Sequence, residues 1–248
     1  MGIMQKKRMI AVSIMLVFLL VIAGVLGGIK LYRVHKARQC GIVLCFDDYN
    51  AANWEEYFDL FDKYGAKVTF FVNCSEPTDF CDHAVERGHE IGFHTINHTD
   101  LRTVSSEEVY EQAIAPLEVF REKGFDITTF AYPYGSYDQE LNDLLLQHYK
   151  VLRGAYFYQL VGKHEMRNGF VESLSIDNIN YESDEQFEKR IDEILDELSQ
   201  NVGAVVSLYS HAISGGGWCV TDDRLEYILK KAHEMGIQFY TFKELQKN

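Results

Sequence analysis

The chain has 248 residues, of which 47% are hydrophobic, and a formal net charge of −13 at pH 7. Residues 1–38 hold seven of the 24 Lys and Arg and no acidic residue, so the remainder combines 17 basic with 37 acidic residues. This acidity argues against DNA, RNA and other polyanions as ligands, because phosphate binding needs a basic surface, and it favours a neutral or cationic substrate.

An apolar run near the N-terminus predicts a membrane anchor. Residues 9–29 contain Ser13 as their only polar side chain, and as a helix they extend about 30 Å, one hydrocarbon core. The run is longer than a signal-peptide core, and basic residues flank both of its ends, so charge leaves the orientation open. We expect a cytoplasmic N-terminus over 1–8, a transmembrane helix over 9–29, a juxtamembrane linker over 30–40 and one domain over 41–248.

The first half of that domain alternates strands with helices. Short apolar runs predict strands over residues 41–46, 67–72, 90–93 and 128–131. Helices are predicted over residues 53–64 and 81–87, with a long third one between Ser105 and Gly124. Ser105 and Glu108 form a capping box that begins this long helix, and the glycine follows its end.

The second half continues the alternation after a helix over 139–148 and a strand over 150–153. Residues 154–180 show no clear period and predict loops with one or two short strands. Further elements are expected in this order: a helix opened by Ser183 and Gln186 to about residue 198, a strand over 204–209, a helix over 223–235, a strand over 238–240 and a final turn capped by Thr241 and Glu244.

Strands that alternate with helices indicate a parallel sheet and an α/β fold. Roughly seven strand–helix repeats suit a barrel better than a short open sheet. Candidate site residues follow the predicted strands, at the C-terminal ends where barrel enzymes place their active sites. They are Asp47, Asp48, His94, His98, Tyr134 and His211.

Asp48, His94 and His98 are the candidate metal ligands. Two histidines four residues apart can direct their rings at one ion, and a carboxylate at a strand end completes a set that leaves positions open for water and substrate. Zn²⁺ is the expected metal, and Co²⁺, Ni²⁺ or Mn²⁺ also suit these ligands. An isolated pair with this spacing is more often two exposed histidines, so the prediction depends on the aspartates.

Three further residues are candidates for catalysis. Asp47 is a candidate general base, although it could instead cap the following helix, and spacing alone leaves open which aspartate has which role. His211 ends an apolar strand beside a glycine-rich loop and is a candidate general acid. Tyr134 lies in a Pro-Tyr-Gly turn that could present a backbone N–H to an oxyanion or an aromatic ring to a sugar.

Five cysteines occur, at positions 40, 45, 74, 81 and 219, without any CxxC motif. The sequence leaves open whether Cys74 and Cys81 form a disulfide or all five are free thiols.

Taken in order, several segments resemble the polysaccharide deacetylase, or NodB-homology, domain of carbohydrate esterase family 4. The matching segments are residues 44–48 (LCFDD), 67–72 (KVTFFV), 88–98 (GHEIGFHTINH), 132–135 (YPYG) and 208–211 (LYSH). The resemblance extends over about residues 41–246. It implies a distorted (β/α) barrel that hydrolyses N-acetyl, sometimes O-acetyl, groups on a glycan, outside the cell membrane.

The resemblance also implies roles for the candidates. Asp47 is the base, Asp48 is a metal ligand, the N–H of Tyr134 helps to hold the oxyanion, and His211 protonates the departing amine.

Two positions depart from the family pattern. Tyr49 stands where members usually carry Gly, and Ala131 stands where the turn motif often begins with an Arg that steadies the base. Arg167 is a candidate to compensate for that Arg. Asp177 is a candidate for the carboxylate that supports the acidic histidine.

Two other functions fit the same residues. The substitutions at Tyr49 and Ala131 are compatible with a weakened enzyme that binds glycans without turnover. Hydrolysis of a small amide is the other alternative. An open groove lined by Trp54, Tyr134 or Trp218 would favour a polymer, whereas a closed pocket would favour the small amide.

Overall fold

The structure, a computed structural model, describes residues 40–215 and 217–246, with a few isolated residues between 15 and 29. The predicted anchor is therefore described only at scattered positions, and the predicted linker only at Cys40. Within the described residues, no helix is both long enough and apolar enough to cross a membrane.

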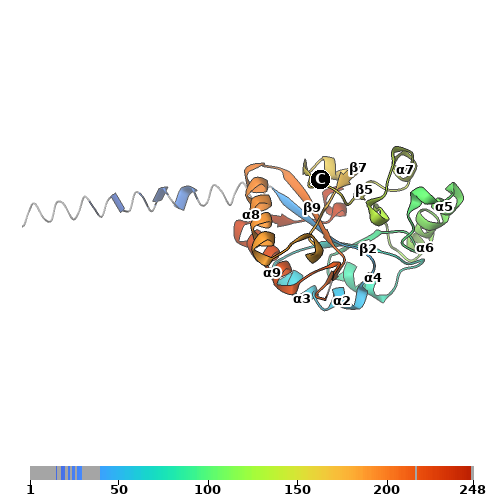
Figure 1. Cartoon of the computed structure of the whole chain (residues 1–248), viewed down its shortest axis with the longest axis horizontal. Coiled ribbons are helices and arrows are strands. Elements are labelled where there is room, and N and C mark those ends of the chain that lie inside the picture. The colour runs from blue at the N-terminus through green and yellow to red at the C-terminus, as the bar shows by residue number, and fades with distance from the viewer. Residues whose placement is uncertain are drawn as a thin grey trace, which may run out of the picture.

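A curled sheet forms the centre of the domain, and helices surround it (Figure 1). Its strands run in the order β6-β9-β1-β2-β3-β4-β5-β7, with β12 paired to β1 and β8 paired to β9. All pairings are parallel except that of β6 with β9. The strands, including the separate pair β10–β11, are β1 (Gly41–Phe46), β2 (Val68–Val72), β3 (Glu90–Phe93), β4 (Thr129–Ala131), β5 (Val151–Gly154), β6 (Leu160–Gly162), β7 (Gly169–Glu172), β8 (Leu174–Ser175), β9 (Ala204–Ser210), β10 (Ala212–Ile213), β11 (Cys219–Val220) and β12 (Gln238–Phe239).

One segment bridges the two sides of the curl. Its first strand, β7, pairs with β5, and its second strand, β8, pairs with β9. Residues 169–175 therefore connect β5 to β9, and the sheet is barrel-like, as predicted. The segment lies in the part of the sequence that showed no clear period.

The helices confirm most predicted positions but divide two predicted elements. They are α2 (Ala51–Glu55), α3 (Phe58–Lys63), α4 (Asp79–Glu86), α5 (Ser106–Ala113), α6 (Pro116–Glu122), α7 (Gln139–Leu145), α8 (Asp184–Gln200), α9 (Asp222–Met235) and α10 (Phe242–Gln246), with 3₁₀ turns η1 (Leu101–Thr103), η2 (Pro133–Gly135), η3 (Glu165–Arg167) and η4 (Asn178–Asn180). The expected helix over 53–64 is two helices, α2 and α3. The expected long helix after Ser105 is also two, because Pro116 lacks the N–H that a continuous helix needs and instead begins α6.

Side-chain alternation along β1 divides the core into two layers. Ile42, Leu44 and Phe46 pack against the surrounding helices in the larger cluster of buried residues. Val43 and Cys45 belong to a smaller cluster inside the curl. The strand is buried on both faces, which explains why it appears in the sequence as a continuous apolar run.

All five cysteines are described, and Cys45, Cys74, Cys81 and Cys219 are free thiols. Burial is the largest cause that raises the pKa of Cys74, to about 12, and the neighbouring Cys81 adds to it. No disulfide joins these two residues in the structure.

Candidate active site

The two aspartates after β1 differ in conformation and burial. The Asp47 N–H donates to the Ser210 carbonyl at 2.9 Å, so the pairing of β1 with β9 extends to this residue. Asp47 is two residues beyond Cys45 and shares its side of the strand, and it is only 2% exposed. Asp48 adopts a left-handed backbone (φ 72°), and its side chain is 37% exposed. Both residues line the same cavity.

Asp48, His94 and His98 form a three-residue cluster. One potential ligand atom from each lies within 4.8 Å of the other two. Asp48 Oδ1 is 3.4 Å from His94 Nε2 and 3.2 Å from His98 Nε2. Burial acts to raise the pKa of Asp48, but the hydrogen bond and charge of His94, with smaller contributions from His211 and His98, lower it to about 2.

The tautomer of His94 is fixed by its surroundings. His94 Nδ1 lies 2.7 Å from the Ala131 carbonyl oxygen, which can only accept, so Nδ1 carries the proton. In the neutral ring, Nε2 then carries the lone pair, which is directed at the cluster. A ring held by a backbone carbonyl in this way is typical of metal-ligating histidines, and the donor set fits a divalent cation.

Unusual backbone conformations are concentrated at this site. Positive φ angles occur at Asp48 (72°), Tyr49 (52°), Thr95 (63°), His98 (54°) and Tyr134 (57°). Such conformations cost energy in non-glycine residues and often occur at functional sites. Tyr49 adopts the left-handed region that glycine favours, which explains why glycine suits this position. Its hydroxyl contacts that of Thr78.

Asp47 forms a buried ion pair with an arginine. Arg153 Nη2 donates to Asp47 Oδ2, and both side chains are almost fully buried. Burial lowers the pKa of the Arg153 guanidinium, but the Asp47 carboxylate more than offsets this and the net pKa is raised. The second oxygen of Asp47, Oδ1, has no hydrogen-bond partner among the described residues.

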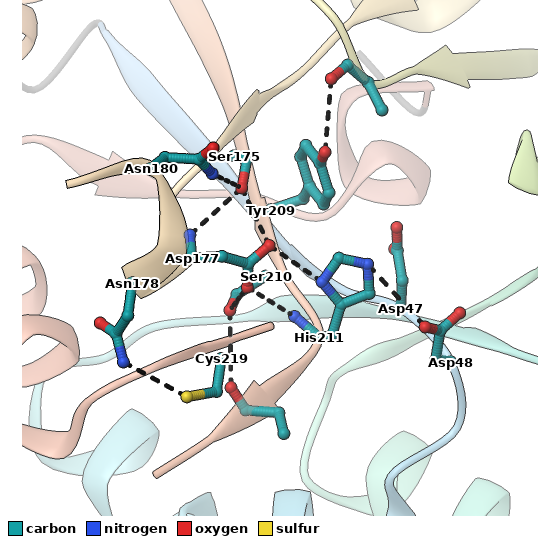
Figure 2. A network of polar contacts seen from close by, with 12 residues as sticks. Asp47, Asp48, Ser175, Asp177, Asn178, Asn180, Tyr209, Ser210, His211 and Cys219 are labelled. Atoms are coloured by element: carbon teal, nitrogen blue, oxygen red, sulfur yellow. Dashed lines mark hydrogen bonds and ion pairs between the residues drawn. The ribbon is translucent and has the colours of Figure 1, made fainter. Parts of the chain in front are cut away.

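His211 is held by a buried carboxylate (Figure 2). Its Nδ1 is 2.9 Å from Asp177 Oδ2, and its Nε2 is 3.8 Å from Asp48 Oδ2. Asp177 is completely buried and also accepts from the hydroxyls of Ser175 (2.9 Å) and Ser210 (2.6 Å). Burial lowers the pKa of His211, but the hydrogen bond to Asp177 and the negative charges nearby give a net increase.

Tyr134 occupies the middle of η2. The Tyr156 hydroxyl donates to its carbonyl oxygen at 2.7 Å, and its ring centroid is 4.4 Å from that of His98. The turn therefore places the ring of Tyr134 beside the metal-ligand cluster.

These residues surround an open cavity of about 930 Å³. Three exposed aromatic side chains line it: Tyr134 at 60%, Tyr156 at 57% and Trp218 at 59%. Exposed rings of this kind offer stacking surfaces to sugars.

Trp54 lies in the core, whereas Tyr134 and Trp218 line the cavity. Trp54 is fully buried, its ring stacks on Phe70 with centroids 5.0 Å apart, and its indole N–H donates to the His211 carbonyl at 2.7 Å. Its role is to support the backbone of His211 from the core.

The structure brings together six of the residues singled out from the sequence: Asp47, Asp48, His94, His98, Tyr134 and His211. Asp177 lies behind His211. Arg167 ends η3, and its side chain is outside what the structure describes. Arg153 was not predicted, because it stands in an apolar strand 106 residues away from Asp47. The one available signal was a charged residue within a predicted strand, which requires a partner if the strand is buried.

Comparison with known proteins agrees with this geometry. Residues 35–150 match the sequence model of a family described as polysaccharide deacetylase. The peptidoglycan-N-acetylglucosamine deacetylase PgdA of Listeria monocytogenes is 30% identical over 121 residues, which are 46% of this chain and 26% of that protein. Chitin deacetylase 1 of Saccharomyces cerevisiae is 33% identical over 106 residues, 41% of this chain and 34% of that one. The chain thus spans about a fifth to a third of the length of the curated relatives it matches.

Solved structures share the fold. The peptidoglycan deacetylase PdaC from Bacillus subtilis aligns with a TM-score of 0.56 and 21% identity, covering 84% of this chain and 91% of that one. The chitin deacetylase from Colletotrichum lindemuthianum aligns with a TM-score of 0.57 and 20% identity, covering 84% and 89%.

Proposed function

Since the chain belongs to the polysaccharide deacetylase family, we propose that it is a metal-dependent hydrolase that removes N-acetyl groups from a cell-surface or extracellular glycan. One observation carries the proposal. The Asp48–His94–His98 cluster shares a cavity with a carboxylate, Asp47, and with His211. O-acetyl groups are the alternative substrate of the same chemistry.

Asp48, His94 and His98 would hold the metal, and Zn²⁺ is the ion we propose, with Co²⁺, Ni²⁺ or Mn²⁺ as substitutes. A bound divalent cation lowers the pKa of a coordinated water and polarises a carbonyl oxygen. The fixed tautomer of His94 supports this assignment, because its free lone pair is directed at the cluster.

Asp47 acts as the general base. Its Oδ1 has no partner among the described residues and takes a proton from the water as the water oxygen bonds to the acetyl carbonyl carbon. The backbone N–H of Tyr134 donates to the oxyanion that forms.

His211 acts as the general acid. Asp177 fixes its Nδ1 as a proton donor, so the opposite nitrogen, Nε2, is the one that faces Asp48 and the cavity. When the C–N bond breaks, Nε2 gives its proton to the departing nitrogen, and the products are acetate and a free amine.

The openness of the site supports a polymeric substrate rather than a small amide. Tyr134, Tyr156 and Trp218 expose their rings along the cavity, where a chain of sugars can stack. The non-enzymatic alternative rests on Tyr49 and Ala131. Arg153 answers the second of these, because it supplies a cation to Asp47. We also propose that residues 9–29 anchor the protein in the cell membrane, with the catalytic domain outside.

Acetate release tests the proposed function. The purified full chain, loaded with Zn²⁺, is expected to release acetate from chitopentaose or from peptidoglycan fragments, and a chelator is expected to stop the release. Asp47→Asn is the matched inactive variant. Zinc-loaded protein that releases no acetate from any N-acetylated glycan would overturn the proposal.

A further inference from the structure

Arg153 lies one strand away from the position where the family pattern places an arginine. Ala131, in β4, stands at the family position, and Arg153, in β5, is its register partner across the parallel pair. Register partners on neighbouring strands lie side by side and point to the same face of the sheet. A guanidinium on β5 therefore approaches the interior at the same level as one on β4.

The small side chain of Ala131 is consistent with this exchange. Ala131 belongs to the cluster inside the curl, together with Phe71 and Tyr209, the two rings that Arg153 contacts. A methyl group at position 131 leaves space in this layer, whereas two arginines side by side would place two like charges in a dry interior.

Two aromatic rings hold the guanidinium. The central carbon of the Arg153 guanidinium lies 5.2 Å from the Phe71 ring centroid and 4.7 Å from that of Tyr209. The Tyr209 hydroxyl in turn donates to the Ala155 carbonyl at 3.3 Å. A planar cation that contacts two rings has little rotational freedom.

The guanidinium has Asp47 as its side-chain acceptor within the described residues. Arg153 Nε and Nη1 find no acceptor there, and Nη2 donates to Asp47 Oδ2. One carboxylate oxygen is thereby fixed, while Oδ1 stays available on the same rigid group.

We propose that Arg153 is the positioning residue for Asp47, having taken over from the neighbouring strand the role of the arginine that Ala131 replaces. It fixes Oδ2 and so aims Oδ1 at the attacking water. Arg153 acts through Asp47 and touches no reacting atom. This inference rests on the proposed function, in which Asp47 is the base.

A relocation experiment tests the inference. In the zinc-loaded full chain, Arg153→Ala is expected to lower kcat for chitopentaose by roughly 100-fold, the cost of a misplaced catalytic group, with KM nearly unchanged. Adding Ala131→Arg to that variant is expected to restore at least a tenth of the lost activity, because the guanidinium then returns from β4. Arg153→Lys should have a kcat between those of the wild type and Arg153→Ala, since lysine keeps the charge but lacks the planar guanidinium.

The controls separate positioning from folding. Arg121→Ala removes an exposed arginine on α6 and is expected to change nothing. A kcat for Arg153→Ala within twofold of the wild type would overturn the inference. So would a relocated double variant that melts like the wild type but is no more active than Arg153→Ala.

A second measurement does not depend on activity. In the metal-free protein, a double-mutant cycle of Asp47→Asn and Arg153→Met is expected to give non-additive melting-temperature shifts, because each single variant leaves one buried partner unpaired. Additive melting-temperature shifts would contradict the contact between Asp47 and Arg153. If the wild type releases no acetate while the shifts are non-additive, the proposed function fails and the Asp47–Arg153 pairing stands.

Discussion

Single hydrogen bonds determine which nitrogen of His94 and of His211 faces the cavity. The Ala131 carbonyl fixes the proton of His94 on Nδ1, and Asp177 does the same for His211. In both rings Nε2 is then the nitrogen that lies toward Asp48, at 3.4 Å and 3.8 Å. The two histidines differ in charge environment, because only His211 has a buried carboxylate behind it. This difference suits His94 to act as a neutral metal ligand and His211 to act as a proton donor.

Metal content distinguishes the roles of the two aspartates. We expect Asp48→Ala and His98→Ala to weaken metal binding by more than the roughly 10- to 100-fold cost of removing an outer partner. Asp47→Asn should bind metal like the wild type, because Asp47 pairs with Arg153 instead. The measurement is zinc per chain after equilibration with a metal buffer. Equal zinc in all three variants would contradict the ligand assignment.

The pH dependence of the reaction should report the Asp177–His211 pair. The pKa of His211 is raised above its ordinary 6.5, so its protonated form is present below the raised value and is lost as pH rises through it. Activity is therefore expected to fall on the alkaline side of that value. Asp177→Asn removes the main cause of the increase and should move this limb to lower pH in a kcat profile. An unshifted limb would show that another group titrates.

At the level of elements, apolar strands and capped helices were predictable, whereas the strands within residues 154–180 were not. The apolar runs of β1 and β9 and the capped helix α8 lie close to their predicted positions, and the Ser183 hydroxyl accepts from the Gln186 N–H as its capping motif predicts. By contrast, β7 and β8 are only partly buried, so their sequences lack the apolar run that marks β1 and β9. Asp177 follows this segment, so its position beside His211 could only be guessed.

The interior of the sheet requires a glycine in β3. A Cβ at Gly92 would lie 2.5 Å from the Phe71 ring and 2.8 Å from the Thr129 hydroxyl. We expect Gly92→Ala to lower the free energy of unfolding by about 1–3 kcal/mol through overpacking, measured by urea denaturation. Phe71→Leu in the same chain should recover part of this loss. A Gly92→Ala variant as stable as the wild type would contradict the described packing.

At the level of the whole molecule, the curled sheet assembles a site from residues far apart in the chain. Asp47 and Arg153 are 106 residues apart, and His211 lies further still along the sequence. The sequence alone could place polar residues at strand ends, and its resemblance to a known family assigned their roles. It could not identify Arg153, because that contact depends on which strands become neighbours and on the face each side chain takes.

Metal binding should stabilise the whole domain, because Asp48 follows β1 whereas His94 and His98 follow β3. Zinc at about 100 times its dissociation constant is expected to add about 2.7 kcal/mol to the free energy of unfolding. A rise in melting temperature on zinc addition, read by differential scanning calorimetry, checks this expectation. Asp48→Ala is the control and should show no comparable rise. Equal shifts in both proteins would indicate binding elsewhere.

The register pairing of Ala131 with Arg153 has an evolutionary consequence. A lineage that exchanges the arginine between these positions passes through an ancestor with both cations or with neither. The first crowds like charges in a dry interior, and the second leaves a buried carboxylate unpaired. We therefore expect the two sites to covary among descendants, with arginine at one position and a small residue at the other.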